Sequence, residues 1–469
     1  MPARDLRGFL VALDAEGDLA RIRLPVNPNG EIGAVAARAA DLPPAQRHAL
    51  LFDQVSGEGG TPSPFRVAAN LYATHDRMAL ALNATSLDDI RSRFARLFDF
   101  NFPRGSMGMM TRLADFIDLA RSLGTSTGMV RPPPVQKIVH RETVNALLLP
   151  AIRVSMRETH PSLTAALLIV KDANGMSHLR SVRAAVLDSH TLAVQLDPAL
   201  SGDWTASEAR PVALALGADP ALLWSAAVPL PEGFDRGLLA AWLRGKAVPM
   251  ASALSQPLEI PAEAEVVIEG ALTGELAPVE WLDDQGVLRA ETLACLHITA
   301  VTHRERAIVP IRLPGSRDAY WMRRAAERLF GPILKTVLPD VIDVHHVDET
   351  LIIARVGARA DRHKVVYGLW GIVADCRRVV IVPSDVDPFD AQAVIDALLN
   401  GIDVIAVDDR FALLASEEKS STPGFEADTA LAERLTQLVG VNWTLYGGRM
   451  AIVGTEAEAF ERIAFDVRS

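Results

Sequence analysis

Apolar residues near the amino terminus recur at the three- and four-residue spacing of one helix face, at Leu6, Phe9, Leu10 and Leu13. Asp5 stands directly before them, where its side chain can cap the helix, and Gly17 can end it. The first part of the chain is therefore predicted to be an α/β domain. Similar patterns predict short strands over 21–26, 49–52 and 66–71 and helices over 31–40 and from 86 to 98.

The middle of the chain changes to short apolar or alternating segments separated by turn residues. One helical pattern, over 235–245, interrupts them. Such a series is typical of a barrel-like or sandwich sheet rather than of a doubly wound sheet. The predicted strands are 163–170, 183–187, 191–196, 212–216, 266–269 and 293–301.

The last third alternates between strands and helices. A helix over 318–330 is predicted to end at Gly331-Pro332, because proline cannot donate the backbone hydrogen bond that continues a helix. The segments that follow predict a βαβαβ unit with a mainly parallel sheet. They are 351–356, 362–376, 379–383, 388–400 and 403–407, before a final helix over 428–438.

A polar segment with grouped acidic residues lies between the predicted strands 266–269 and 293–301. It contains Glu280, Trp281, Asp283 and Asp284. Carboxylates beside an aromatic residue, on a loop held by two apolar strands, can act as a general acid or base. The alternative is a solvated hairpin tip.

Composition limits the classes of function. The 469 residues are 49% hydrophobic and 22% charged, with a net charge of −11 and a pI near 5.5, which argues against nucleic-acid binding. No apolar segment reaches the roughly 20 residues that a membrane helix needs, and the first residues lack a secretion signal. Cys295 and Cys376 lie far apart in apolar runs, so we expect reduced thiols in a cytoplasmic protein.

Common nucleotide-binding and catalytic motifs do not explain the chain. It contains no GxxxxGK[ST], no strand-linked GxGxxG and no HExxH, and Gly124–Gly128 follows no predicted strand and is interpreted as a plain loop. His345-His346 is an adjacent pair, and adjacent residues on a strand point to opposite faces. The two imidazoles therefore do not readily chelate one metal ion.

Several stretches, taken in order, resemble the UbiD family of decarboxylases. No single stretch is decisive, but together they span nearly the whole chain, and this order is hard to obtain by chance. They are Leu6–Leu10 with Gly17–Leu19, Ala49–Phe52, Asn70–Tyr72 with Arg77–Leu80, Ala213–Pro220, Leu243–Gly245, Val267–Gly270, Ile298–Arg304 and Val386–Pro388.

The resemblance implies an α/β (α+β) multidomain fold. An amino-terminal α/β domain (1–112) would precede a central split β-barrel that holds a flavin (113–317) and a carboxy-terminal α/β oligomerisation domain (318–469). The implied activity is decarboxylation, or reversible carboxylation, of an aromatic, heteroaromatic or α,β-unsaturated carboxylic acid. Prenylated FMN would be the cofactor, with Mn2+ and K+ at its phosphate, and the chain would form a homodimer or a larger homo-oligomer.

Carried over by position, the family's catalytic arginine falls on Arg183. Its guanidinium would bind a carboxylate bidentately, which a lysine cannot do. The family's two acids fall on Glu280 and on Asp284 or Asp283. For Arg183, the alternative is a surface cation paired with any nearby acid.

The family's metal-binding positions are altered in this chain. His178 replaces the metal-binding asparagine, Gln195–Pro198 lacks the histidine that is the family's second ligand, and the third ligand falls near Asp235 or Arg236. The run before the first barrel strand also departs, since Arg157–Ser162 replaces a stretch rich in Gly-Gly-Pro-Tyr. The sequence therefore predicts an incomplete metal site with His178 and Asp235 as its candidate ligands.

Two other functions stay open. The chain can be a cofactor-poor paralogue that serves as a non-catalytic partner of a second, competent UbiD-type subunit. Alternatively, the pocket can bind a different flavin or nucleotide, with His178 and Arg180 on one face of a strand holding a phosphate without metal. Arg183 would then lie on the other face unless a bulge intervenes.

Overall fold

The computed structural model describes residues 5–57, 62–98, 131–171, 175–196, 209–228, 235–283, 286–347, 350–373, 376–407, 410–415 and 466–467. They fall into two compact units. The first unit is drawn from 1–86, 103–322 and 450–469, and the second from 87–102 and 323–449. The predicted helix over 428–438 and the predicted acid Asp284 lie outside the described residues.

The amino-terminal helix forms as the sequence predicts. Helix α1 (Leu6–Ala15) begins where the Asp5 carboxylate accepts a hydrogen bond from the Gly8 backbone N–H at 2.8 Å. Its four apolar residues Leu6, Phe9, Leu10 and Leu13 are buried. Around it lie β1 (Leu19–Ile22), α2 (Glu31–Ala40), β2 (Ala49–Phe52), β3 (Arg66–Ala69) and α3 (His75–Ala81).

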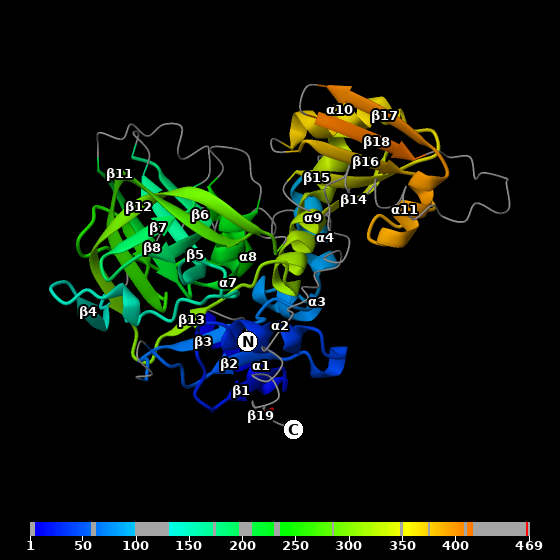
Figure 1. Ribbon diagram of the computed structural model, residues 1–469. Coiled ribbons are helices and arrows are strands. Elements are labelled where there is room, and N and C mark those ends of the chain that lie inside the picture. The colour runs from blue at the N-terminus through cyan, green and yellow to red at the C-terminus, as the bar shows by residue number, and fades with distance from the viewer. Residues whose placement is uncertain are drawn as a thin grey trace, which may run out of the picture. The chain divides into compact units, whose positions relative to one another are not determined.

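A small mixed sheet organises this part of the first unit (Figure 1). Its strand order is β13-β3-β2-β1-β19, with β13 (Ile308–Pro310) contributed from beyond the barrel and β19 (Asp466–Val467) from the end of the chain. Strand β1 is parallel to β2, and β3 is parallel to β13. The chain therefore returns to its amino-terminal sheet after completing the barrel.

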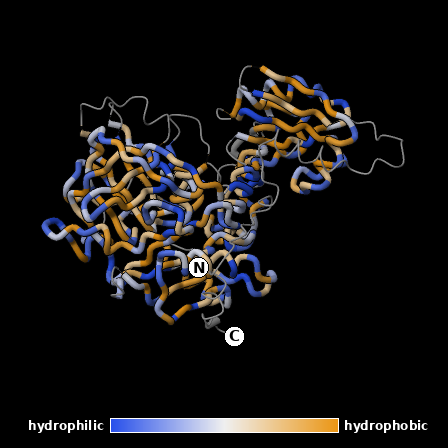
Figure 2. Tube along the Cα trace, in the orientation of Figure 1, coloured by the Kyte–Doolittle hydropathy of each residue, from blue (hydrophilic) through white to orange (hydrophobic). Residues whose placement is uncertain are grey.

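The predicted barrel is present in the first unit. Among the described residues, β11, β8, β5, β6, β7 and β12 are hydrogen-bonded in that order, and β11 also pairs with β12, which closes six strands into a barrel. The barrel strands carry hydrophobic stretches (Figure 2). The bounds are β4 (Ile138–His140), β5 (Ser162–Lys171), β6 (Ser177–Val186), β7 (Thr191–Val194), β8 (Arg210–Leu216), β9 (Met250–Ser252), β10 (Glu259–Pro261), β11 (Val266–Leu282) and β12 (Leu288–His303), with α7 (Pro220–Ala227) and α8 (Arg236–Arg244).

The hairpin formed by β11 and β12 is longer than predicted, and the expected polar loop is largely strand. Pairing continues from Val266 opposite His303 to Leu282 opposite Leu288. Glu280 and Trp281 are therefore strand residues, and the turn begins only at Asp283. Exposed and buried positions alternate only over 278–281, whereas 273–277 are partly or fully exposed and include a register shift against β12, so the sequence shows no continuous strand pattern there.

The second unit contains the predicted βαβαβ alternation, with two corrections. Strands β15, β16 and β18 are parallel to one another. The first correction is that β17 (Ile402–Val407), predicted as the next parallel strand, pairs antiparallel with β18. The second is that β18 (Arg410–Ala415) was not predicted from the sequence. The bounds are α4 (Leu87–Phe98), β14 (Val341–His346), β15 (Leu351–Val356), α10 (Arg362–Ile372), β16 (Arg378–Val382), α11 (Ala391–Leu399), β17 (Ile402–Val407) and β18 (Arg410–Ala415).

The predicted helix end at Gly331-Pro332 is wrong. Helix α9 (Arg317–Val337) continues through Pro332. A proline inside a helix removes one backbone hydrogen bond, but Leu334 beyond it packs against the core of the second unit. This burial offsets the missing bond. No helix in the described part of the chain has the length and hydropathy needed to cross a membrane.

Candidate active site

Arg183 lies on β6, on the face opposite to the barrel core. Val182 and Ala184, its neighbours along the strand, belong to that core, whereas Ala185 packs with Trp281 in a separate small cluster. His178 and Arg180 pair across the strands with Val170 and Leu168 of β5, which belong to the barrel core. His178 and Arg180 therefore lie on the barrel-core face of β6.

The alternation therefore separates Arg183 from His178 and Arg180, which was the expectation for a strand without a bulge at these positions. His178 and Arg180 are both partly exposed, whereas the Arg183 side chain is only 8% exposed. A surface cation was the alternative interpretation of Arg183, and its burial argues against that alternative.

Among the described residues, Trp281, Leu282 and Glu158 contact or approach the Arg183 guanidinium. Its carbon lies 4.4 Å from the centroid of the Trp281 ring, a stacking geometry that favours a cation. Its Nη1 donates a hydrogen bond to the backbone carbonyl of Leu282. Its Nη2 lies 3.8 Å from Oε1 of Glu158, so the two charges are close without a direct hydrogen bond at that separation.

Glu158 is a buried carboxylate that the sequence analysis did not select. It lies on the loop before β5, only 2% exposed. Its Oε2 accepts hydrogen bonds from the backbone N–H groups of Val154 (2.6 Å) and Ser155 (3.1 Å), and its Oε1 accepts one from Leu282 (3.1 Å). Glu158 thus ties its own loop to the end of β11, directly beside Arg183.

Trp281 is held in place from its other edge. Its indole Nε1 donates to Oε1 of Glu291 at 3.1 Å, and Gln195 donates to Oε2 of the same carboxylate at 3.1 Å. The Gln195 backbone N–H in turn donates to the Arg183 carbonyl at 3.0 Å. The indole that stacks on the guanidinium is consequently fixed by hydrogen bonds as well as by packing.

The structure does not bring Glu280 together with Arg183. Glu280 is exposed on β11, on the face opposite to Trp281, because successive strand residues point to opposite sides. Its backbone pairs with Thr159, which donates to its carbonyl at 3.0 Å and accepts from its N–H at 3.0 Å. Asp283 closes the turn, accepting from the Val287 N–H at 2.8 Å and pairing with Arg289 at 3.0 Å.

Asp235 caps helix α8. Its Oδ1 accepts hydrogen bonds from the N–H groups of Gly237 at 2.8 Å and Leu238 at 3.2 Å. The first turn of this helix lies against β6, where a Cβ added to Gly237 would come within 3.9 Å of Leu179.

The expected metal ligands do not form a complete set. Within the described ranges, no group of three or more His, Cys, Asp or Glu side chains could hold a metal ion. A divalent ion that also binds a phosphate needs several convergent oxygen or imidazole ligands. His178 and Asp235 alone do not fit Mn2+.

Family models match most of the chain. They are described as the 3-octaprenyl-4-hydroxybenzoate carboxy-lyase amino-terminal domain at residues 10–97, the Rift-related domain at 128–317 and the carboxy-terminal domain at 320–406. The chain belongs to the UbiD family. Family membership supports a carboxy-lyase in general, and the three matched segments follow the order of the elements described above.

Relatives and solved structures agree with this assignment. Proteins of Archaeoglobus fulgidus and Aquifex aeolicus, both described as uncharacterized, are each 28% identical over 428 residues, which is 86% and 85% of this chain and 85% of each relative. The UbiD-class enzyme HmfF of Pelotomaculum thermopropionicum, solved with prFMN, has a TM-score of 0.72 at 21% identity, over 90% of this chain and 98% of its own. Vanillic acid decarboxylase (ShVdcCD) of Sedimentibacter hydroxybenzoicus has a TM-score of 0.71 at 19% identity, over 93% and 99%. At these identities the two structures show a shared fold.

Proposed function

We propose that this UbiD-family chain is a non-oxidative carboxy-lyase for an aromatic, heteroaromatic or α,β-unsaturated carboxylic acid, and that Arg183 binds the substrate carboxylate. The observation that carries the proposal is the buried guanidinium of Arg183, stacked on Trp281 at 4.4 Å. A guanidinium in a low-dielectric site binds a carboxylate with two parallel hydrogen bonds, more strongly than it would in water.

In this proposal, prenylated FMN supplies the electron-accepting chemistry for the loss of CO2. His178 and Arg180 share the barrel-side face of β6, so both can approach one anionic group from the same side. We assign the cofactor phosphate to these two side chains. Asp235 caps α8, whose first turn packs against Leu179 on the other face of β6, so it is not assigned to the phosphate.

The proton that replaces CO2 on carbon is assigned to the hairpin acids Asp284 or Glu280. Glu280 faces solvent, so it requires a movement of the hairpin to reach a substrate near Arg183. Undiminished turnover in Glu280→Gln would leave Asp284 as the donor.

The proposal is tested on protein produced together with a prenylated-FMN synthase. We expect a bound flavin at one equivalent by absorbance and intact mass, and CO2 release from a panel of aromatic and enoic acids. Arg183→Lys keeps the charge but not the bidentate geometry, and should lower kcat/KM by about 100-fold. A flavin-loaded protein that releases no CO2 from any acid, or an equally active Arg183→Lys, contradicts the proposal.

A second candidate is a non-catalytic subunit that partners a competent UbiD-type chain. The specific observation in its favour is that Asp235, a candidate ligand, already caps a helix, and that the described residues contain no group of three side chains able to hold a metal ion. This candidate predicts a colourless protein after co-production with the synthase. It also predicts a stable complex with a catalytic family member, detectable by size-exclusion chromatography.

A further inference from the structure

We propose that Glu158 is the positioning residue for Arg183: its buried carboxylate orients the guanidinium and limits how tightly that guanidinium holds a substrate carboxylate. The inference rests on the proposed function, because it concerns the same site. Glu158, rather than Glu280, would be the carboxylate that lies beside Arg183, and proton donation stays with the hairpin acids.

The hydrogen bonds of Glu158 fix its position. Three backbone N–H groups, two from its own loop and one from Leu282, donate to its two oxygens at 2.6–3.1 Å. These donors hold the carboxylate in one orientation, so its oxygen stays 3.8 Å from Nη2 of Arg183. The arrangement places a negative charge beside the guanidinium without the short contact of a closed ion pair.

Glu158 and Arg183 are connected through the backbone of Leu282 as well as through their charges. The Leu282 N–H donates to Glu158, and its carbonyl accepts from Nη1 of Arg183. The backbone of Leu282, at the end of β11, is therefore bound by Glu158 and in turn binds Arg183. Because Trp281 precedes Leu282, the stacking partner of the guanidinium is set by the same contacts.

The chemistry of decarboxylation gives this geometry a purpose. As the bond between carbon and CO2 breaks, the negative charge leaves the carboxylate, so a group that binds the carboxylate tightly stabilises the substrate more than the transition state. A fixed negative charge near Arg183 weakens the grip on the carboxylate at the start of the reaction. Removing it should tighten binding and slow turnover.

A rise in affinity together with a fall in rate distinguishes the proposed role of Glu158 from a structural one. A residue with a merely structural role would weaken binding and turnover together when removed. In Glu158→Gln we expect the affinity for benzoate to rise about threefold, because the neighbouring negative charge is gone. In the flavin-loaded enzyme we expect kcat to fall about tenfold while KM stays constant or decreases.

A double-mutant cycle isolates the pair. Benzoate binding to the full-length chain is measured by titration calorimetry in wild type, Glu158→Gln, Arg183→Met and the double variant. Methionine keeps an unbranched apolar stem for Trp281 but removes the charge. Benzoate affinity should fall at least tenfold in Arg183→Met, and Glu158→Gln should then have no further effect. Glu275→Gln, a change of an exposed glutamate on β11, the strand that carries Trp281 and Leu282, is the matched control and should bind as wild type does.

Several results would overturn the inference. They are weaker benzoate binding in Glu158→Gln, an equal effect of that change with and without Arg183, and a wild-type chain that does not bind benzoate. If Glu158→Gln does not fold, Glu158→Asp replaces it, and withdrawing the charge by one methylene should raise benzoate affinity by about twofold. The calorimetric cycle can succeed while no acid is decarboxylated, which would reject the proposed function and keep the carboxylate site.

Discussion

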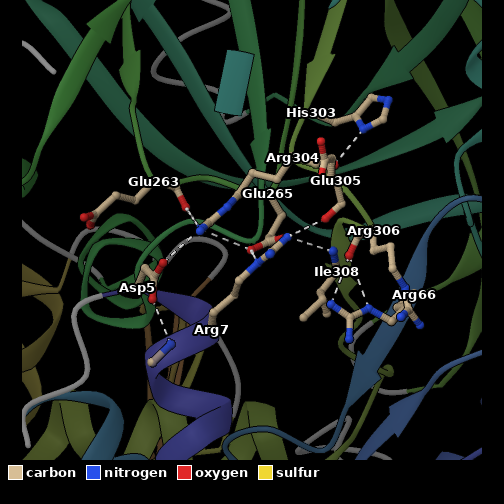
Figure 3. Close-up of polar contacts among 11 residues, drawn as sticks. Asp5, Arg7, Arg66, Glu263, Glu265, His303, Arg304, Glu305, Arg306 and Ile308 are labelled. Atoms are coloured by element: carbon tan, nitrogen blue, oxygen red, sulfur yellow. Dashed lines mark hydrogen bonds and ion pairs between the residues drawn. The ribbon is translucent and has the colours of Figure 1, made fainter. Parts of the chain in front are cut away.

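Two buried glutamates of the first unit face arginines, and they do so in different ways. Glu265 is fully buried and receives Arg7 bidentately, at 2.7 Å from Nε and 2.8 Å from Nη2 (Figure 3). The Ile308 N–H donates to it at 3.0 Å, and Arg304 lies 3.4 Å away. Glu158, by contrast, stands 3.8 Å from Arg183 and gives its oxygens to backbone donors.

The difference separates a structural contact from a contact suited to a ligand. Arg7 and Glu265 join helix α1 to the start of β11, and a bidentate pair with further donors leaves no place for another carboxylate. Arg183 has a charged neighbour that is held back from it by other bonds. The first pair should therefore govern stability, and the second should govern affinity for an acid.

The largest expected effect is at the structural pair. Glu265→Gln removes the charge between Arg7 and Arg304 and should lower the free energy of unfolding by about 3 kcal/mol, because it leaves buried donors poorly compensated. Urea denaturation measures this loss, with Glu275→Gln as the exposed control. A loss similar to that of the control would remove the distinction between the two pairs.

A third buried glutamate, in the second unit, extends the comparison to pH. Burial alone raises the pKa of Glu327, but His345 at 3.0 Å and Arg324 at 2.5 Å outweigh it and lower the pKa to about 2. Because the folded pKa lies below the unfolded value, this group stabilises the fold above about pH 4.5, and the contribution is lost as the pH falls towards 2.

The expected size of this effect is about 2 kcal/mol between pH 5 and pH 2. The measurement is the difference in unfolding free energy between wild type and Glu327→Gln over that range. The difference should shrink on acidification, and a difference that is constant with pH would show that the carboxylate is not held ionised by its neighbours.

The smallest expected effect is at Trp281. Trp281→Phe keeps an aromatic face for Arg183 but removes the hydrogen bond from Nε1 to Glu291, at a cost of about 1 kcal/mol in unfolding free energy. Benzoate affinity should change less than twofold, since the stacking face remains. An affinity loss as large as that of Arg183→Met would assign the recognition of the acid to the indole.

Much of the fold could be predicted from local pattern. The Asp5 cap, the barrel strands and the parallel strands β15 and β16 follow from spacing and β-branched runs that agree with their tertiary surroundings. The helix through Pro332 and the full length of β11 did not follow, because packing and cross-strand pairing decided them.

The site was predictable only in part. The two-residue period of a strand predicted that Arg183 lies on the other face of β6 from His178 and Arg180, as it does. The catalytic role that the family pattern gives to Arg183 stays a prediction. Glu158 was missed because its burial depends on Leu282, which lies 124 residues farther along the chain. An acidic residue in a turn-rich segment carries no local signal of burial. Glu280 was selected because the family's acid falls on it and because it belongs to a group of carboxylates beside Trp281.

The most direct test of the difference between the two pairs is a crystal structure of the full-length protein with benzoate. We predict both carboxylate oxygens of benzoate at about 3 Å from the Arg183 guanidinium, with Glu158 still bound to the backbone of 154, 155 and 282 and with Arg7 still on Glu265. Benzoate bound elsewhere, with the surroundings of Arg183 unchanged, would contradict the assignment of Arg183 as the carboxylate-binding residue.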